Sequence, residues 1–277
     1  MFHSYRIKAI LLTVFIAIPL SGLAQVGPLD SLMNLAKNYH LKKEYMKSNE
    51  CYEQILATIQ PYDGDARLTN IIRGTMAINY IYSGVDLFKD KYFAEAKPYF
   101  EKALEYAAND PKALPVANSW MGDWYSWKAL DMRISKTDLQ QAVEYSLMAE
   151  HHYKQANATD KLLKEQVSRS AALHELLQIE SAKQLLLQVI GQCESVESRE
   201  RILASALCEL GEIELKSENF QSAILYLERC YGLSISKNKP TAYLAAIKLV
   251  QLYETDIPDQ TKAELWKSRA ETIDQQE

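Results

Sequence analysis

The amino-acid sequence predicts an all-α protein built from repeated helical hairpins. Glycine and proline are sparse, with nine and eight in 277 residues, so few positions interrupt a helix. These few breakers stand in a chain whose residues are 48% hydrophobic, which favours long amphipathic helices. Two segments, residues 80–106 and 207–233, also carry the same order of small and large residues. Together these observations predict stacked helix–turn–helix units.

The chain begins with a segment typical of a cleaved secretory signal. Arg6 and Lys8 precede an apolar run of twelve residues, 9–20, and small residues follow up to Ala24. Twelve residues are too few to cross a hydrocarbon core, since a membrane-spanning helix takes about 20. We therefore predict a signal peptide over residues 1–24, cleavage after Ala24, and a periplasmic or secreted mature chain. An uncleaved N-terminal anchor is the alternative.

Residues 25–277 are expected to form one soluble domain. They contain no low-complexity segment, no long linker and no stretch apolar enough to span a membrane. No cysteine stands at the predicted cleavage site, so the pattern of a lipoprotein is missing. The formal net charge of the full chain is −5, and its basic residues are scattered. Nucleic-acid binding usually needs a basic patch, so no nucleic-acid partner is expected.

The two repeated segments share a fixed spacing. In the first segment, Gly84 is followed twelve residues later by Ala96, and then by Phe100 and Ala103. The second segment places residues of similar size at the same intervals: Gly211, Ala223, Leu227 and Cys230. Small residues let two helices approach closely, and large ones fill the groove between one hairpin and the next.

This pattern resembles the tetratricopeptide repeat, a helix–turn–helix unit of about 34 residues. The resemblance implies an α-solenoid of about six hairpins over residues 25–277, wound as a right-handed superhelix. Ala36 and Ser48 match the spacing in the first unit. In the third unit Gly122 and Ala142 are twenty residues apart, so its first helix is expected to be about eight residues longer. The fourth and sixth units match only weakly.

No catalytic or metal-binding motif is complete. His174 and Glu175 begin like the zinc-protease motif, but Gln178 stands where that motif needs its second histidine. His151 and His152 are adjacent, so on a helix they point about 100° apart and chelate poorly; they are expected to be a surface pair. Nucleophile-elbow, phosphate-loop, dinucleotide-binding and C-x-x-C patterns are absent. We predict a non-enzyme without cofactor or metal.

Three of the four tryptophans lie within eight residues. Trp120, Trp124 and Trp127 are spaced i, i+4, i+7, so a helix places them on one face. One interpretation is that all three pack against the neighbouring helix, as aromatic stripes usually do. The other is that one or two stay exposed as contact anchors, because tryptophan is enriched at binding hot spots.

The resemblance places the ligand face on the concave side, which first helices line. In the fifth unit it points to Ser205, Cys208, Glu212 and Leu215. The residues that we predict to bind a partner are Ile78, Ile81, Val85, Phe88, Trp120, Trp124 and Trp127. The side chains on this predicted face are apolar or uncharged for the most part. In the units whose repeat positions can be assigned, Lys37 is the only clear basic residue on it. The cationic clamp of chaperone-binding members is therefore not expected.

The predicted function is that of an exported, non-catalytic scaffold that binds a protein or peptide. One alternative is a carbohydrate-binding module that uses the tryptophan stripe with Asp123 and Ser126 nearby. Another is the sensor half of a bacterial regulatory system. Exposure of the three tryptophans distinguishes the first two hypotheses, because a sugar platform needs exposed, coplanar rings.

The four cysteines are expected to pair little or not at all. A disulfide needs Cα atoms about 4.4–6.8 Å apart, and each repeat of a solenoid contacts only its neighbours. Two repeats separate Cys51 from Cys193, so Cys51 is predicted to be a free thiol. If any bridge forms, Cys193–Cys208 is the preferred pair; four reduced thiols are the alternative.

Overall fold

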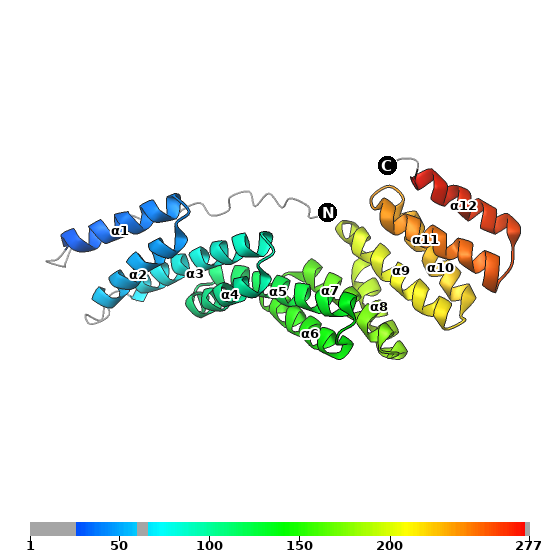
Figure 1. Ribbon diagram of the computed structural model, residues 1–277, viewed down its shortest axis with the longest axis horizontal. Coiled ribbons are helices and arrows are strands. Elements are labelled where there is room, and N and C mark those ends of the chain that lie inside the picture. Colours follow the sequence, from blue (N-terminus) through cyan, green and yellow to red (C-terminus); the bar gives the residue numbers. More distant parts are fainter. Residues whose placement is uncertain (1–25, 60–65, 275–277) are drawn as a thin grey trace. The chain divides into compact units, whose positions relative to one another are not determined.

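The structure, a computed structural model, describes residues 26–59 and 66–274. The predicted signal peptide lies outside the described residues. Twelve α-helices and no strand occur in the part that is described, and Figure 1 shows them as successive hairpins. This confirms the predicted all-α fold of about six hairpins. By its contacts the chain divides into two compact units, Met1–Asp65 and Ala66–Glu277, which are described separately.

The first unit holds one hairpin, α1 (Val26–Leu41) and α2 (Tyr45–Ile59). The small residues predicted from spacing meet here, since Ser48 Oγ donates a hydrogen bond to the backbone oxygen of Ala36 over 2.9 Å. Both residues are fully buried. The contact brings the two backbones close together, as the repeat pattern requires.

The second unit holds five hairpins. Their helices are α3 (Ala66–Lys89), α4 (Phe93–Ala107), α5 (Ala113–Ser135), α6 (Leu139–Gln155), α7 (Thr159–Glu175), α8 (Ile179–Cys193), α9 (Glu200–Lys216), α10 (Phe220–Ser234), α11 (Lys239–Gln251) and α12 (Gln260–Asp274). A short 3-10 helix, Glu197–Arg199, precedes α9, and a π-helical turn, Leu252–Asp256, follows α11. No helix of the described chain is long and apolar enough to cross a membrane.

Glycine permits the closest helix approach at the predicted positions. A Cβ atom on Gly84 would lie 2.6 Å from Cε1 of Phe100, and one on Gly211 would lie 2.8 Å from Cγ of Leu227. Phe100 and Leu227 are both fully buried. No side chain fits between these helices, so the Gly-to-large spacing read from the sequence is a direct packing contact.

The third hairpin has a different register from the one predicted. A Cβ atom on Gly122 would lie 2.6 Å from Cε1 of Tyr153, so Tyr153 takes the place that Phe100 holds in the second hairpin. Ala149, four residues before it and fully buried, then takes the small position that we assigned to Ala142. With 23 residues, α5 is longer than α9, with 17, but not longer than α3, with 24. The insertion, however, extends both helices beyond the Gly122–Tyr153 contact.

The weak fourth unit also follows the pattern. Ser170, Ala182 and Leu186 have the spacing of Gly84, Ala96 and Phe100, and all three are fully buried. Serine thus replaces glycine at the close approach of α7 and α8. A hydrophobic cluster around Phe100 spans α3, α4 and α5, and another, which includes Leu186 and Leu227, spans α6 to α12.

Candidate partner-binding surface

The predicted residues of α3 lie mostly in the core. Ile81 is 3% exposed and Val85 5%, and both belong to the cluster around Phe100. Ile78 and Phe88 are half-buried and pack against the same cluster. The ring of Phe88 meets that of Phe93 edge-on at 4.9 Å between centroids. These side chains join α3 to α4 and α5, which leaves little of them exposed to a partner.

The three tryptophans are also held by internal contacts. Trp124 is 8% exposed, and its indole N–H donates to the backbone oxygen of Phe93 over 2.7 Å. Trp127 stacks on Phe93 at 4.0 Å between centroids and 16° between planes. The planes of Trp124 and Trp127 differ by 59°, and Trp120 stacks on Phe100. Because Trp124 is buried and its plane is tilted against that of Trp127, these two rings form no flat exposed platform of the kind that carbohydrate binding needs.

A polar seam joins α5 and α7. Lys161 Nζ on α7 lies 2.6 Å from Asp123 Oδ2 on α5 and donates to Ser119 Oγ over 2.9 Å. The hydroxyl of Tyr153 donates to the other oxygen of Asp123, also over 2.9 Å. A carboxylate, an ammonium group and two hydroxyls thus satisfy one another beside the close approach at Gly122.

Two buried carboxylates extend this seam. Arg169 Nε on α7 contacts Glu150 Oε1 on α6 at 2.6 Å, and the Glu150 side chain is 4% exposed. Glu165 is also buried, and one of its oxygens accepts a hydrogen bond from Ser126 Oγ. Its other oxygen, Oε1, has no hydrogen-bond partner in the structure. Burial raises the pKa of Glu165, against the lowering effect of the Ser126 hydrogen bond. The buried site favours the neutral acid.

This carboxyl makes stability depend on pH. The pKa of Glu165 is higher in the folded chain than the ordinary 4.5. At pH values between 4.5 and the folded-state pKa, the folded state therefore binds more protons than the unfolded state. The free energy of unfolding therefore falls as pH rises through that window. Glu165→Gln keeps the shape and removes the ionisable group. The variant should melt above the parent at pH 7, and the difference should shrink towards pH 4.

Thermal melts followed by circular dichroism between pH 4 and pH 8 measure this effect. The exposed Glu218→Gln serves as the control and should change the melting temperature little at any pH. A Glu165→Gln variant that is less stable than the parent at pH 7 would show that the buried group is ionised and stabilising.

Charge pairs also connect the first helices further along the unit. Arg133 of α5 pairs with Glu175 of α7 at 3.4 Å. Lys248 of α11 pairs with Glu212 of α9 at 2.7 Å, with both side chains about a quarter exposed, at 24% and 30%. Two of the basic side chains on this row of helices, Arg133 and Lys248, therefore already have an acidic partner.

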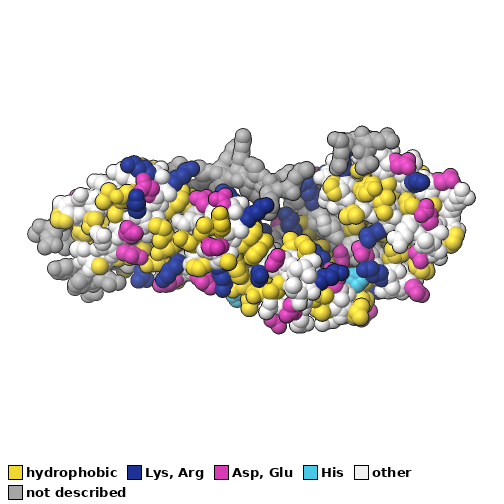
Figure 2. Space-filling view, in the orientation of Figure 1, with side chains coloured by type: hydrophobic (Ala, Val, Ile, Leu, Met, Phe, Trp, Pro, Cys, Tyr) yellow, Lys and Arg dark blue, Asp and Glu magenta, His cyan; other side chains and the backbone are white. Residues whose placement is uncertain are grey.

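Helix α11 carries a compact group of exposed apolar side chains on a first helix. Tyr243 is 38% exposed, Leu244 53% and Ile247 39%. Their spacing places them on one side of the helix, and Figure 2 shows hydrophobic side chains gathered over this region. Ala246, fully buried, occupies the position of Gly211, so Tyr243 and Ile247 correspond to Cys208 and Glu212. Because the sixth unit matches the repeat only weakly, these positions could not be assigned from the sequence.

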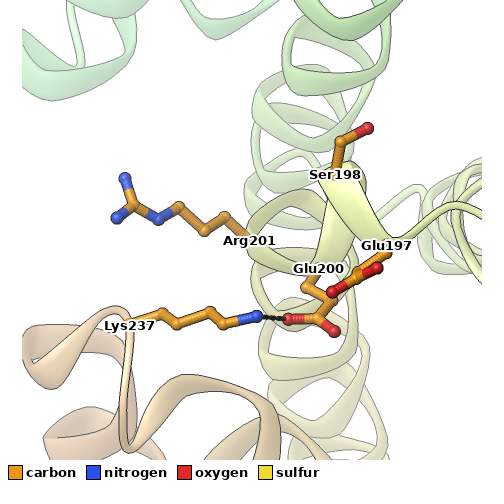
Figure 3. A pocket seen from close by; sticks show the side chains of 5 residues that line it. All are labelled: Glu197, Ser198, Glu200, Arg201 and Lys237. Atoms are coloured by element: carbon orange, nitrogen blue, oxygen red, sulfur yellow. Dashed lines mark hydrogen bonds and ion pairs between the residues drawn. The ribbon is translucent and has the colours of Figure 1, made fainter.

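A polar depression lies beside the start of α9. It is lined by Glu197, Ser198, Glu200, Arg201 and Lys237. Figure 3 shows Lys237 directed at Glu200, with which it forms an ion pair, and Arg201 extended away from that pair. Charges of both signs stand around an open surface, so no ligand class is favoured here.

The histidines fit structural roles. His152 is half-buried rather than on the surface, because its ring stacks on Tyr125 at 5.5 Å and its Nδ1 lies 2.9 Å from Asn118 Oδ1. Burial lowers the pKa of His152. His151 is exposed, and Gln178 stands at the residue just before α8 without a capping hydrogen bond from its side chain. Within the described ranges, no group of three or more His, Cys, Asp and Glu residues is arranged to hold a metal ion.

All four cysteines are free thiols in the structure. The alternative of four reduced thiols therefore matches the structure. The cysteines that interact, to judge by their shifted pKa values, are Cys208 and Cys230 rather than Cys193 and Cys208. The reason is that α9 and α10 form one hairpin with glycine at its closest approach. Cys193 ends α8 and lies in a different hairpin.

No protein-family model matches the sequence, and no curated protein matches it. Solved structures do match. BtubC from P. vanneervenii is 16% identical, with a TM-score of 0.55 over 88% of this chain and 90% of that one. Aspartyl phosphate phosphatase F from Bacillus subtilis is 14% identical, with a TM-score of 0.55 over 92% and 76%. At these identities the likeness shows the fold alone. That fold, together with the repeat contacts above, is a tetratricopeptide-like helical repeat.

Proposed function

We propose that the chain is an exported, non-catalytic scaffold that binds a protein or peptide along its first helices. The observation that carries this proposal is the exposed apolar group on α11, formed by Tyr243, Leu244 and Ile247. Adjacent exposed apolar side chains on one helix face often mark a contact site. The paired charges of Glu212 and Lys248 beside them provide a polar rim, as at many protein interfaces.

Export is the second part of the proposal and rests on the N-terminal segment alone. Its basic start, short apolar run and small residues before Gln25 are typical of a cleaved signal. Mass spectrometry of the chain isolated from its native cells should find Gln25 as the first residue. A chain that retains residues 1–24 would contradict cleavage while leaving the binding proposal open to its own test.

Site-specific photo-cross-linking tests the binding surface. A photoreactive phenylalanine at Tyr243 should give discrete cross-linked products in native cells. A second substitution, Leu244→Glu, should reduce their yield at least tenfold, because it places a charge among apolar contacts. The matched control is Leu225→Glu, since Leu225 is similarly exposed, at 62%, but lies on a second helix. Equal loss from both variants, or no discrete product, would overturn the assignment to α11.

Changes at Phe88 are a poor test of binding. Its ring packs against Phe93, Phe100 and Trp120, so Phe88→Glu would bury a charge in the core and damage the fold. The variants on α11 avoid this difficulty because their side chains are exposed in the free chain.

A further inference from the structure

Cys208 and Cys230 occupy facing positions in the fifth hairpin. Gly211 and Leu227 mark the closest approach of α9 and α10. Cys208 lies one turn before Gly211, and Cys230 lies one turn after Leu227. Because the two helices run antiparallel, these turns are level with each other. This register therefore places the two thiols opposite each other in the hairpin.

The two thiols differ in environment. Cys208 is partly exposed on the first-helix face, whereas Cys230 is fully buried. Interaction with the Cys230 thiol lowers the pKa of Cys208, and the nearby Lys248 ammonium acts in the same direction against burial. Interaction with Cys208 and burial raise the pKa of Cys230. A partly exposed thiol that faces a second, buried thiol is the arrangement typical of a redox-sensitive cysteine with its resolving partner.

The other two cysteines lack these features. Cys51 is 6% exposed and Cys193 is 1% exposed. Burial is the main cause that raises the pKa of each. Neither forms a hydrogen bond with another thiol in the structure. They serve as internal controls within the same chain.

We propose that Cys208 is an oxidation site for hydroperoxides and that Cys230 resolves it into a disulfide between α9 and α10. The Cys208 thiolate attacks the peroxide, an S–O bond forms and the O–O bond breaks, and the alcohol or water leaves. The Cys230 thiol then attacks the sulfur of the sulfenic acid, an S–S bond forms, and water leaves. Two thiols are oxidised by two electrons in total, and one hydroperoxide is reduced by the same two electrons.

Peptide mapping of the full chain tests this directly. Trypsin places each cysteine in its own peptide, with Cys208 in residues 202–216 and Cys230 in residues 230–237. After reduction, treatment with stoichiometric hydrogen peroxide and alkylation, these two peptides should appear joined. Cys51 and Cys193 should be recovered as alkylated thiols. Cys193→Ser should leave the joined peptides unchanged, and Cys208→Ser should abolish them.

The order of the two steps is tested by trapping. In Cys230→Ser, the sulfenic acid at Cys208 has no resolving thiol and should accumulate as a dimedone adduct. In Cys208→Ser, Cys230 should give no adduct, because it is buried. Circular dichroism checks that both variants stay folded. Failure of the folded parent to join these peptides, or dimedone labelling of Cys51 or Cys193 as strong as that of Cys208, would overturn the proposal.

Discussion

Arg169→Met should lower the free energy of unfolding by about 3–5 kcal/mol at pH 7, because it leaves the buried Glu150 carboxylate without its charge partner. The Glu150 side chain is 4% exposed, and its contact with Arg169 at 2.6 Å is its closest polar contact. Urea denaturation followed by circular dichroism measures the change.

A second-site change separates charge from packing. Glu150→Gln in the Arg169→Met background removes the unpaired charge and should restore most of the lost stability. Arg229→Met is the surface control, since Arg229 pairs with Glu194 where both side chains are more than 40% exposed. It should cost less than about 1 kcal/mol. Equal losses from Arg169→Met and Arg229→Met would mean that the buried pair contributes no more than a surface one.

Leu227→Ala should lower the free energy of unfolding by about 2–5 kcal/mol, because Leu227 is fully buried against Gly211 and its removal leaves a cavity. Leu225→Ala changes the same residue type in the same helix at 62% exposure. It should alter stability by no more than about 0.5 kcal/mol. The same urea titration measures both.

The glycine opposite Leu227 gives a sharper test of the contact. Gly211→Ala should destabilise the parent, because the new Cβ would lie 2.8 Å from Cγ of Leu227. In the Leu227→Ala background the clash is gone, and alanine is favoured over glycine in a helix by about 0.5–1 kcal/mol. The same substitution should then stabilise. Additive effects in this double-mutant cycle would contradict the direct contact.

The sequence by itself determined the fold class and the clearest repeat contacts. Gly84 with Phe100, and Gly211 with Leu227, lie within one hairpin and are separated by a short turn. Helical periodicity and a fixed turn length are sufficient to bring such residues together. The sequence also showed that the zinc-protease motif is incomplete at Gln178, because the absence of a required histidine can be recognised without knowing the fold.

Only the tertiary structure decided the register of the third hairpin and the composition of the exposed face. Periodicity says that Trp120, Trp124 and Trp127 share a side of α5, but not that Phe93 and Phe100 cover them. It cannot reveal that α11 leaves Tyr243 and Leu244 exposed, or that Cys208 faces Cys230. These outcomes depend on which helix covers each face. Which helix covers which face depends on the packing of several helices together, and the residue spacing within one helix does not determine it.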